Sequence, residues 1–254
     1  RATISDAHAH GALTVAQVIQ KSSNVGTAKI AAMLPPQKMW EMFDHVGFGR
    51  VSALGFPGEV SGRLRPWKSW RPIEQATMSY GHGISVTLIQ LARAYSVFAR
   101  DGDLVPLSLT RVDSAPPRGT QIFSLQTARE VRAMLEMAVQ PGGTAPMAQI
   151  AGYRVAGKTG TANKLVGGRY TTKYVSSFVG FAPASDPRLI VSVMIDEAGG
   201  TKYYGGEVAA PVFAGVMSSA LRTLGVAPDA PLEVAKSPKN PLAKASFLVC
   251  RRPP

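Results

Sequence analysis

The sequence predicts an α+β fold in which a mainly helical half, residues 1–140, precedes an antiparallel sheet with a covering helix, residues 150–225. Two observations support this division. Apolar residues recur at helical spacing through the first half, and three strand candidates follow one another between residues 152 and 196. An apolar helical pattern at 211–224 comes after them and is suited to cover a sheet. We expect the binding cleft where the two halves meet.

Start and stop signals define the helices of the first half. Pro35 and Pro36 end one helix and begin the next, and Asp101 with Gly102 closes a later one. The predicted helices are 14–21, 25–34, 37–46, 73–80, 86–100 and 125–139. Between them, 50–70 is rich in Gly, Pro and Arg and is predicted as a surface loop, 104–112 as a strand and 115–120 as a loop.

The second half has the pattern of a meander. The strand candidates are 152–161, 174–182 and 189–196, joined through Gly167–Gly168 and through residues 184–187, Ala-Ser-Asp-Pro. Connections this short favour antiparallel neighbours. We therefore expect one unit over residues 1–228. Residues 229–254, rich in Pro, Lys and Ala, are expected to be a poorly ordered tail.

Composition narrows the function classes. Lys and Arg number 28 against 16 acids, a net charge of +12 that indicates anionic surroundings. The cations are scattered and no nucleic-acid motif is present, so we expect no nucleic-acid partner. The apolar runs are too short to span a bilayer. Cys250 is the single cysteine, and His8 and His10 lack further ligands nearby, so neither a metal nor another cofactor is predicted.

Two short motifs carry the chemistry: Ser22–Ser23–Asn24, and Lys158–Thr159–Gly160 followed by Thr161. Each motif alone has an ordinary explanation. Asn24 would cap the helix predicted to begin at residue 25, and Lys158 would be a solvated lysine near a strand end. Serine acyl-transfer enzymes of the penicillin-recognising group, however, use Ser-x-x-Lys, Ser-x-Asn and Lys-Thr/Ser-Gly in that order. The second and third of these elements are present here in order.

The surrounding sequence resembles the transpeptidase domain of class B penicillin-binding proteins, most closely the cell-division (FtsI, or penicillin-binding protein 3) type. The similarity runs from residue 13 to about residue 225. Its matching segments are residues 13–24 with QKSSN, 81–92 (GHGISVTLIQLA), 152–162 (GYRVAGKTGTA), 178–188 (FVGFAPASDPR) and 202–206 (KYYGG). The resemblance implies the penicillin-binding/β-lactamase-like transpeptidase fold.

The resemblance also implies a reaction and its setting. In this family a serine attacks the D-Ala–D-Ala carbonyl of a peptidoglycan stem peptide, D-alanine leaves, and an amine of a neighbouring strand takes the acyl group. β-Lactam antibiotics mimic the donor and trap the acyl-enzyme. The implied location is the bacterial inner membrane at the division septum, with the domain facing the periplasm and the anchor outside this chain. A glycan polymerase of the FtsW type and other division proteins are the implied partners.

Site residues are carried over from the matched motifs. The resemblance gives Ser22 a proton-shuttling hydroxyl and gives Asn24 the contacts to a lysine ammonium and the substrate amide. Lys158 supplies positive potential for the substrate carboxylate, and Thr159 and Thr161 donate hydroxyls to it. Thr161 also offers an N–H as one of two oxyanion-hole donors.

Further residues are predicted to bind substrate or β-lactam: Ser23, Gly160, Tyr203 and Tyr204. The period of two along a strand places Lys158 and Gly160 on one face and the two threonines on the other. A single ligand reaches all four residues only along the edge of the strand, with the lysine curling round and Gly160 leaving space. Tyr203 and Tyr204 match aromatics that flank the pocket of the family, although an ordinary core role stays open. His82 is expected to be structural.

The first motif of the family is missing. No serine is followed three residues later by lysine, and only 21 residues precede Ser22. We therefore expect the sequence to begin after the nucleophile and its lysine, and this chain to be inactive alone. Two alternatives stay open. One is a β-lactamase or carboxypeptidase, although neither Glu59 nor Glu74 lies in a recognisable deacylation loop. The other is a β-lactam-sensing or scaffolding module that lost its nucleophile.

Overall fold

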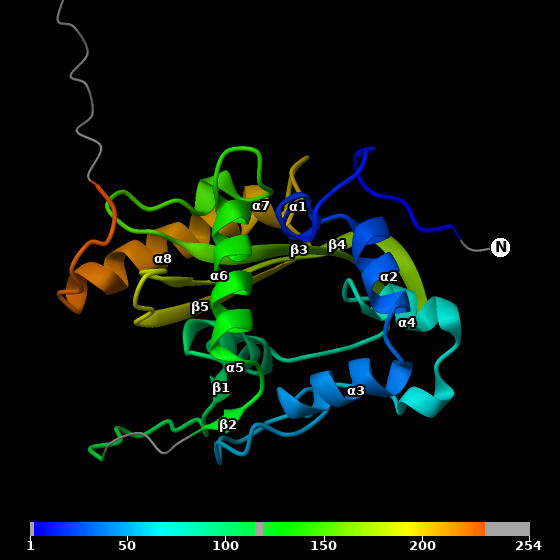
Figure 1. Ribbon diagram of the computed structural model, residues 1–254, viewed down its shortest axis with the longest axis horizontal. Coiled ribbons are helices and arrows are strands. Elements are labelled where there is room, and N and C mark those ends of the chain that lie inside the picture. Colours follow the sequence, from blue (N-terminus) through cyan, green and yellow to red (C-terminus); the bar gives the residue numbers. More distant parts are fainter. Residues whose placement is uncertain (1–2, 115–118, 232–254) are drawn as a thin grey trace, which may run out of the picture.

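The computed structural model describes residues 3–114 and 119–231, and it contains the predicted helical half and sheet (Figure 1). The helices of the first half follow the predicted spans closely. They are α1 (Val15–Lys21), α2 (Asn24–Ala32), α3 (Pro36–His45), α4 (Pro72–Met78), α5 (Leu88–Ala99) and α6 (Leu125–Val139), with a short 3₁₀ turn η1 (Trp67–Ser69). The second half contains η2 (Pro146–Ala148), β3 (Ala156–Val166), β4 (Arg169–Ala182), β5 (Leu189–Asp196), α7 (Gly205–Val208) and α8 (Ala210–Thr223).

The predicted meander is confirmed. The sheet has the order β3-β4-β5 with antiparallel neighbours, and Gly167 and Gly168, both with positive φ, form the turn between β3 and β4. Its register pairs Lys158 with Val179 and Leu165 with Tyr170. Within the described residues, β3 is an edge strand, so one side of its backbone is not paired to another strand.

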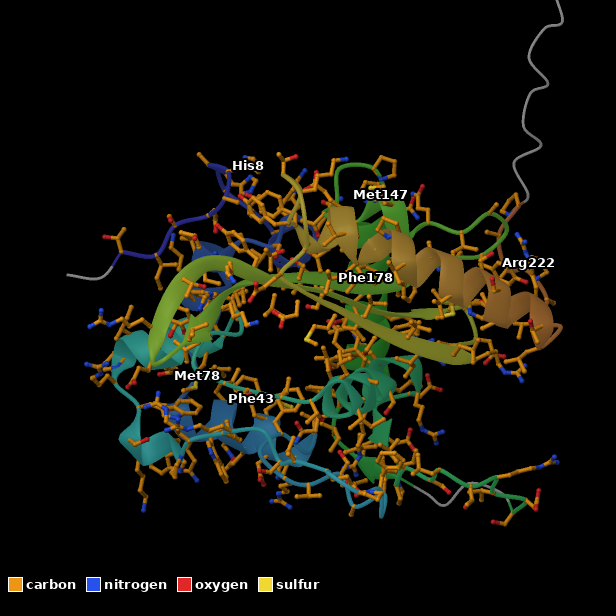
Figure 2. All side chains as sticks on the ribbon, turned by 180° about the vertical axis from the view of Figure 1, so that it is seen from behind. His8, Phe43, Met78, Met147, Phe178 and Arg222 are labelled. Carbon is orange, nitrogen blue, oxygen red and sulfur yellow. The ribbon has the colours of Figure 1, made fainter. Side chains whose placement is uncertain are left out.

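Helices cover both faces of the sheet, as Figure 1 shows: α8 lies on one face, and α5 and α6 on the other. Alternation along β4 produces the two layers. Phe178 points to α8, where its ring lies 4.6 Å from that of Phe213, and Figure 2 labels it between sheet and helix. Phe181 points the other way and packs with Leu135 of α6. The sheet that carries the Lys-Thr-Gly motif is therefore held rigidly from both sides.

The helical half has a smaller core of its own, formed by Ala31, Met39 and Met78 from α2, α3 and α4. Figure 2 shows Met78 and Phe43 in this part of the molecule, away from Phe178. Gln75 of α4 donates from its buried amide to the carbonyls of Ala31 and Leu34 and thereby ties α4 to the end of α2. This tie fixes α2, whose first residues carry the Ser-x-Asn motif.

Two predictions were wrong in extent. Residues 104–112 were predicted as a strand, but only β1 (Asp103–Leu104) forms, paired with β2 (Thr120–Gln121). Most of the predicted loop 115–120 lies outside the described residues. Asp229, placed in the tail, is anchored: its carboxylate accepts from the backbone of Arg154 and from Ser185. From residue 232 onward the predicted tail lies outside the described residues.

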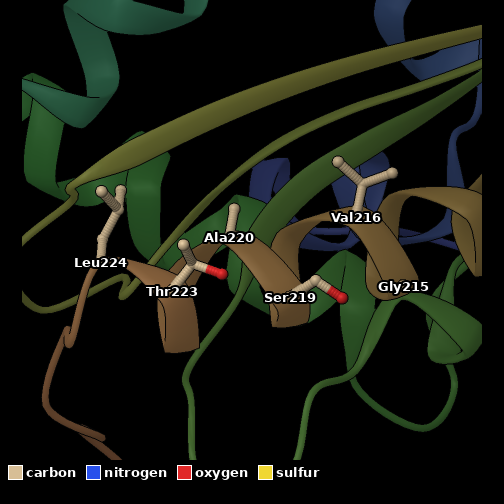
Figure 3. A pocket seen from close by; sticks show the side chains of 6 residues that line it. All are labelled: Gly215, Val216, Ser219, Ala220, Thr223 and Leu224. Carbon is tan, nitrogen blue, oxygen red and sulfur yellow. The ribbon is translucent and has the colours of Figure 1, made fainter.

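Neither the helices nor the concavity on α8 marks a functional site. No helix in the described residues is long and apolar enough to cross a membrane. A shallow concavity of about 720 Å³ lies on the outer face of α8, where Figure 3 shows Val216 and Leu224 beside small residues. It contains no titratable side chain, so we look for the chemistry elsewhere.

Candidate active site

The junction of α1 and α2 presents the first motif. Ser22 ends α1 in the left-handed conformation (φ +57°), which is uncommon for a residue other than glycine, asparagine or aspartate. Its N–H still bonds to the carbonyls of Val18 and Ile19, so the reversal is tight. Ser23 then caps α2 by accepting from the N–H of Gly26. The turn leaves the hydroxyl of Ser22 free to face the sheet.

The second motif contacts the first directly. The Nζ of Lys158 donates to the Oγ of Ser22 at 2.8 Å and to the carbonyl and hydroxyl oxygens of Thr159 at 3.2 and 3.3 Å. Because Thr159 is its neighbour on the strand, the lysine curls round the edge of β3, as predicted. No carboxylate among the described residues forms an ion pair with Lys158. Burial lowers the pKa of Lys158 to about 8.

Both threonines of the motif point to one face, as predicted. Thr159 exchanges a hydrogen bond of 2.9 Å with the hydroxyl of Thr144, and Thr161 accepts from the N–H of Gly205 at 3.0 Å. The space predicted beside Gly160 is not free. A Cβ there would lie 2.5 Å from the Oγ of Ser177, so the glycine accommodates the neighbouring strand rather than a ligand.

Tyr174, Tyr203 and Tyr204 form an aromatic wall, and Gly205, the residue after it, contacts Thr161. The rings of Tyr174 and Tyr203 are stacked with centroids 4.2 Å apart, and those of Tyr203 and Tyr204 lie 4.5 Å apart. Tyr204 is 45% exposed, which rules out the ordinary core role that the sequence left open for it. The hydroxyl of Ser176, a fully buried residue, donates to the carbonyl of Tyr203 and fixes the wall to β4. The Thr161–Gly205 hydrogen bond ties the segment that follows this wall to β3, the strand whose Lys158 contacts Ser22.

Comparison with known proteins agrees with this arrangement. Residues 2–218 match the family described as "Penicillin binding protein transpeptidase domain". The chain belongs to this family. A solved structure described as the apo transpeptidase domain of Burkholderia pseudomallei penicillin-binding protein 3 superimposes with a TM-score of 0.84 at 52% identity, covering 89% of this chain and 69% of that one.

Curated relatives of this transpeptidase domain are named as enzymes. The probable peptidoglycan D,D-transpeptidase PenA of Neisseria flavescens is 46% identical over 94% of this chain and 60% of the relative. The peptidoglycan D,D-transpeptidase FtsI of Escherichia coli K12 is 43% identical over 89% of this chain and 39% of the relative. The chain thus spans about 40 to 60% of the length of these relatives.

Not every predicted site residue of the transpeptidase domain is accessible beside the Ser22–Lys158 pair. Ser23 is only 3% exposed, and its hydroxyl donates to Asp6 while capping α2. Its predicted contact with substrate is therefore corrected to a structural role. The cap expected of Asn24 belongs to Ser23, and α2 begins at Asn24 itself. The amide nitrogen of Asn24 donates to the carbonyl of Ser5 at 3.2 Å, and no hydrogen bond joins this residue to Lys158 in the described part of the chain.

Two residues of the site were missed from the sequence. Asp6 accepts from the hydroxyl of Ser23 at 2.7 Å and from the N–H of Val25 at 3.0 Å, so it braces the Ser-x-Asn turn. The hydrogen bonds from Val25, Ser23 and Asn24 lower its pKa, against the opposing effect of partial desolvation. Tyr174 is the second, and it begins the aromatic wall. Asp6 lies in an irregular segment and Tyr174 in a strand, so no local motif marked either.

Proposed function

We propose that the protein containing this chain is a peptidoglycan D,D-transpeptidase that cross-links stem peptides and is trapped by β-lactams. The observation that carries the proposal is the Ser22–Lys158 pair beside the open edge of β3. An uncompensated ammonium suits a terminal carboxylate, and an edge strand suits an extended peptide. The names of the relatives, PenA and FtsI D,D-transpeptidases, support the same reaction.

In the proposed reaction a serine hydroxyl outside these 254 residues attacks the carbonyl between the two D-alanines. Its oxygen–carbon bond forms, the carbon–nitrogen bond breaks, and the proton goes to the departing D-alanine amine. An amine of a neighbouring strand then attacks the ester and regenerates the serine. Lys158 and the hydroxyls of Thr159 and Thr161 hold the carboxylate, while Ser22 relays the proton to the leaving nitrogen.

Other parts of the site orient the peptide. Asn24 is the first residue of α2 and lies two positions after Ser22. Its side chain is proposed to bind the substrate amide and the lysine ammonium of the missing motif. The N–H of Thr161 acts as one oxyanion donor. Tyr203 and Tyr204 flank the bound donor, with Tyr174 stacked behind them.

We also propose a setting. The protein acts at the division septum from the inner membrane, with this domain facing the periplasm, beside an FtsW-type glycan polymerase and other division proteins. Two findings support this: FtsI is among the relatives, and a net charge of +12 suits a protein between an anionic membrane and an anionic wall polymer. Fluorescent fusions of the full-length protein test the location, and uniform labelling of the envelope would contradict it.

Labelling by a fluorescent penicillin tests the reaction class. The full-length protein should label covalently, and Lys158→Ala should lower the rate by about 100-fold because the carboxylate loses its charged partner. Lys38→Ala is the matched control, since Lys38 is an exposed lysine of α3 paired with Glu41. No labelling of the wild type would overturn the proposal.

Product analysis separates transpeptidation from the alternatives. With stem peptide ending in D-Ala–D-Ala and an amine acceptor, a transpeptidase yields a cross-linked product. A carboxypeptidase yields the free shortened peptide, and a β-lactamase turns over nitrocefin rapidly. Either of the last two results would replace the proposed reaction.

A further inference from the structure

A cluster of cations lies on the segment that leads into α4. Residues 63–71 read RLRPWKSWR, with four cations and no acid. A fifth cation, Arg169, begins β4, and Figure 1 shows the β3–β4 hairpin next to α4. Its neighbour Tyr170 and Arg65 line the same concavity, so Arg169 belongs to this end of the molecule. We call five residues the arginine face: Arg63, Arg65, Lys68, Arg71 and Arg169.

The backbone holds these cations in fixed positions. Arg63 forms an antiparallel bridge with Ser85, donating to its carbonyl at 2.7 Å and accepting from its N–H at 3.1 Å. Arg65 precedes Pro66, which favours an extended backbone at Arg65. Residues two apart on an extended segment point the same way, so Arg63 and Arg65 lie on one side. The turn η1, which packs against α3, then exposes Lys68.

In the described part of the chain, one carboxylate forms ion pairs with the face. One oxygen of Glu74 accepts from Arg65 at 2.8 Å, and the other accepts from the side chain of Arg71 at 3.3 Å. Hydrogen bonds from the backbone of Arg71 and from the two guanidinium groups lower the pKa of Glu74 to about 2, so it stays ionised at neutral pH. Five cations and one carboxylate leave four positive charges in excess.

The surroundings do not compensate this excess. Charged side chains on α3 and on the hairpin form ion pairs among themselves or with residues that follow these elements: Lys38 with Glu41, Arg50 with Asp44, and Lys164 and Lys173 with Asp196 and Glu197. Burial lowers the pKa of His82 in the turn after α4, so its imidazole is neutral at pH 7. The face is therefore available to an anionic partner.

The apolar side chains of the segment do not suit insertion into a membrane. Leu64, Trp67 and Trp70 are half-buried, and no large apolar side chain is exposed within residues 63–71, all of which the structure describes. The indole of Trp70 donates to the carbonyl of Arg65 at 3.0 Å, and the Nζ of Lys68 lies 5.7 Å from the ring centre of Trp67. A membrane-binding face combines cations with exposed apolar anchors. This face has the cations without the anchors.

The side chains of the face are typical of a protein–protein interface. Four of its five cations are arginines, which are enriched at interfaces and among the residues that dominate binding energy, whereas lysines are depleted. A planar guanidinium binds a carboxylate through two parallel hydrogen bonds. Glu74 already holds Arg65 and Arg71, so less side-chain freedom is lost when a partner binds.

We propose that the arginine face docks an acidic segment of another protein. Aspartate or glutamate carboxylates of that segment pair with the guanidinium groups and with Lys68. This docking goes beyond the proposed transpeptidase reaction, because it uses residues that take no part in acyl transfer. It recruits a partner to the end of the domain formed by η1, α4 and the hairpin.

Two labelled peptides test the chemistry of the partner. One is a fluorescein-labelled peptide of about twelve residues in which Glu alternates with Ser, and the other has Gln in place of every Glu. Fluorescence anisotropy measures the dissociation constant of each peptide for the full-length protein. The Glu peptide should bind about 10-fold more tightly at about 0.1 M salt, and the difference should vanish at about 1 M salt, where exposed charges are screened.

Matched variants assign the binding to the face. The test variant lacks three exposed cations of the face: Arg63→Gln, Lys68→Gln and Arg71→Gln. The control variant lacks three exposed cations of α6, the β4–β5 connection and α8: Arg129→Gln, Arg188→Gln and Arg222→Gln. Figure 2 shows Arg222 at the opposite end of the molecule from Met78 of α4. The test variant should bind the Glu peptide about 10-fold more weakly than the wild type, and the control variant should match the wild type.

The outcomes separate docking from general charge, from a membrane and from the proposed reaction. Equal binding of the two peptides by the wild type refutes the docking face, and so does an equal loss in the two variants. Binding to phosphatidylglycerol vesicles that the test variant loses, without binding of the Glu peptide, would make the face a membrane surface and overturn the proposal. Both variants should label with fluorescent penicillin at the wild-type rate, which shows that they are folded. If the wild type does not label, the transpeptidase proposal fails, and the peptide comparison still decides the docking face.

Discussion

The Nζ of Lys158 lies 2.8 Å from the Oγ of Ser22, although the two residues are 136 positions apart in the chain. The contact joins an edge strand to a helix–helix junction, so it depends on how the helical half packs against the sheet. It also leaves the ammonium beside hydroxyls rather than a carboxylate. An ammonium without a carboxylate partner can pair with an anionic ligand, which is the role proposed for Lys158.

The first prediction concerns the pH dependence of acylation. Burial lowers the pKa of Lys158 from 10.5 to about 8, so the amine is almost fully protonated at pH 6, half protonated near pH 8, and neutral at higher pH. The rate constant for acylation by a β-lactam should therefore fall about 10-fold for each pH unit above 8. The Lys158→Arg variant should be acylated more slowly than the wild type, but its rate should not fall above pH 8, because the guanidinium stays charged. If the acylation rate of the wild type begins to fall only above pH 10, the prediction is contradicted.

The second prediction concerns the brace at Asp6. Asp6→Ala removes the acceptor for the hydroxyl of Ser23 and the N–H of Val25, and the loss of such capping contacts costs about 1–2 kcal/mol. The midpoint of denaturant unfolding should fall accordingly. Asp113→Ala is the control, because Asp113 and its partner Arg111 are both largely exposed and the pair contributes little. Equal stability of the two variants would show that Asp6 does not brace the turn.

The third prediction concerns the close approach of α7 to the sheet. A Cβ on Gly205 would lie 2.5 Å from the carbonyl oxygen of Gly160 and would also overlap the carbonyl of Ser177. Gly205→Ala should therefore cost about 1–3 kcal/mol and slow labelling by penicillin, because the segment bearing Tyr204 must move away from β3.

A second glycine provides the comparison for Gly205. Gly199→Ala meets no atom within 4 Å and should leave both the unfolding free energy and the labelling rate near their wild-type values. The close-packing argument would be wrong if Gly205→Ala unfolded at the same denaturant concentration as Gly199→Ala.

The fourth prediction concerns the core between the sheet and α8. Phe213 is fully buried against Phe178, so Phe213→Ala leaves a cavity and should destabilise the domain by about 3–5 kcal/mol. Phe56 is 64% exposed in the loop before α4, and Phe56→Ala should change stability by less than about 0.5 kcal/mol. Chemical denaturation checks both. Comparable losses in the two variants would place the stabilising core elsewhere.

Local signals in the sequence were sufficient for much of the fold. Ser124 caps α6, whose bounds match the prediction, because capping and apolar spacing act within a few residues. The meander was predicted for the same reason, since short turns and strand patterns are local. The strand predicted at 104–112 was wrong because β propensity needs a partner, and β1 finds only two residues of β2.

The sequence by itself also determined the identity of the motifs, and hence which residues can bind a carboxylate or relay a proton. Only the tertiary structure decided which of them meet. In the structure Ser22 contacts Lys158. Ser23 is a buried helix cap that bonds to Asp6, and the side chain of Ser177 occupies the space beside Gly160. These outcomes depend on contacts between segments far apart in the chain, and their geometry is set by the packing of whole helices on a sheet.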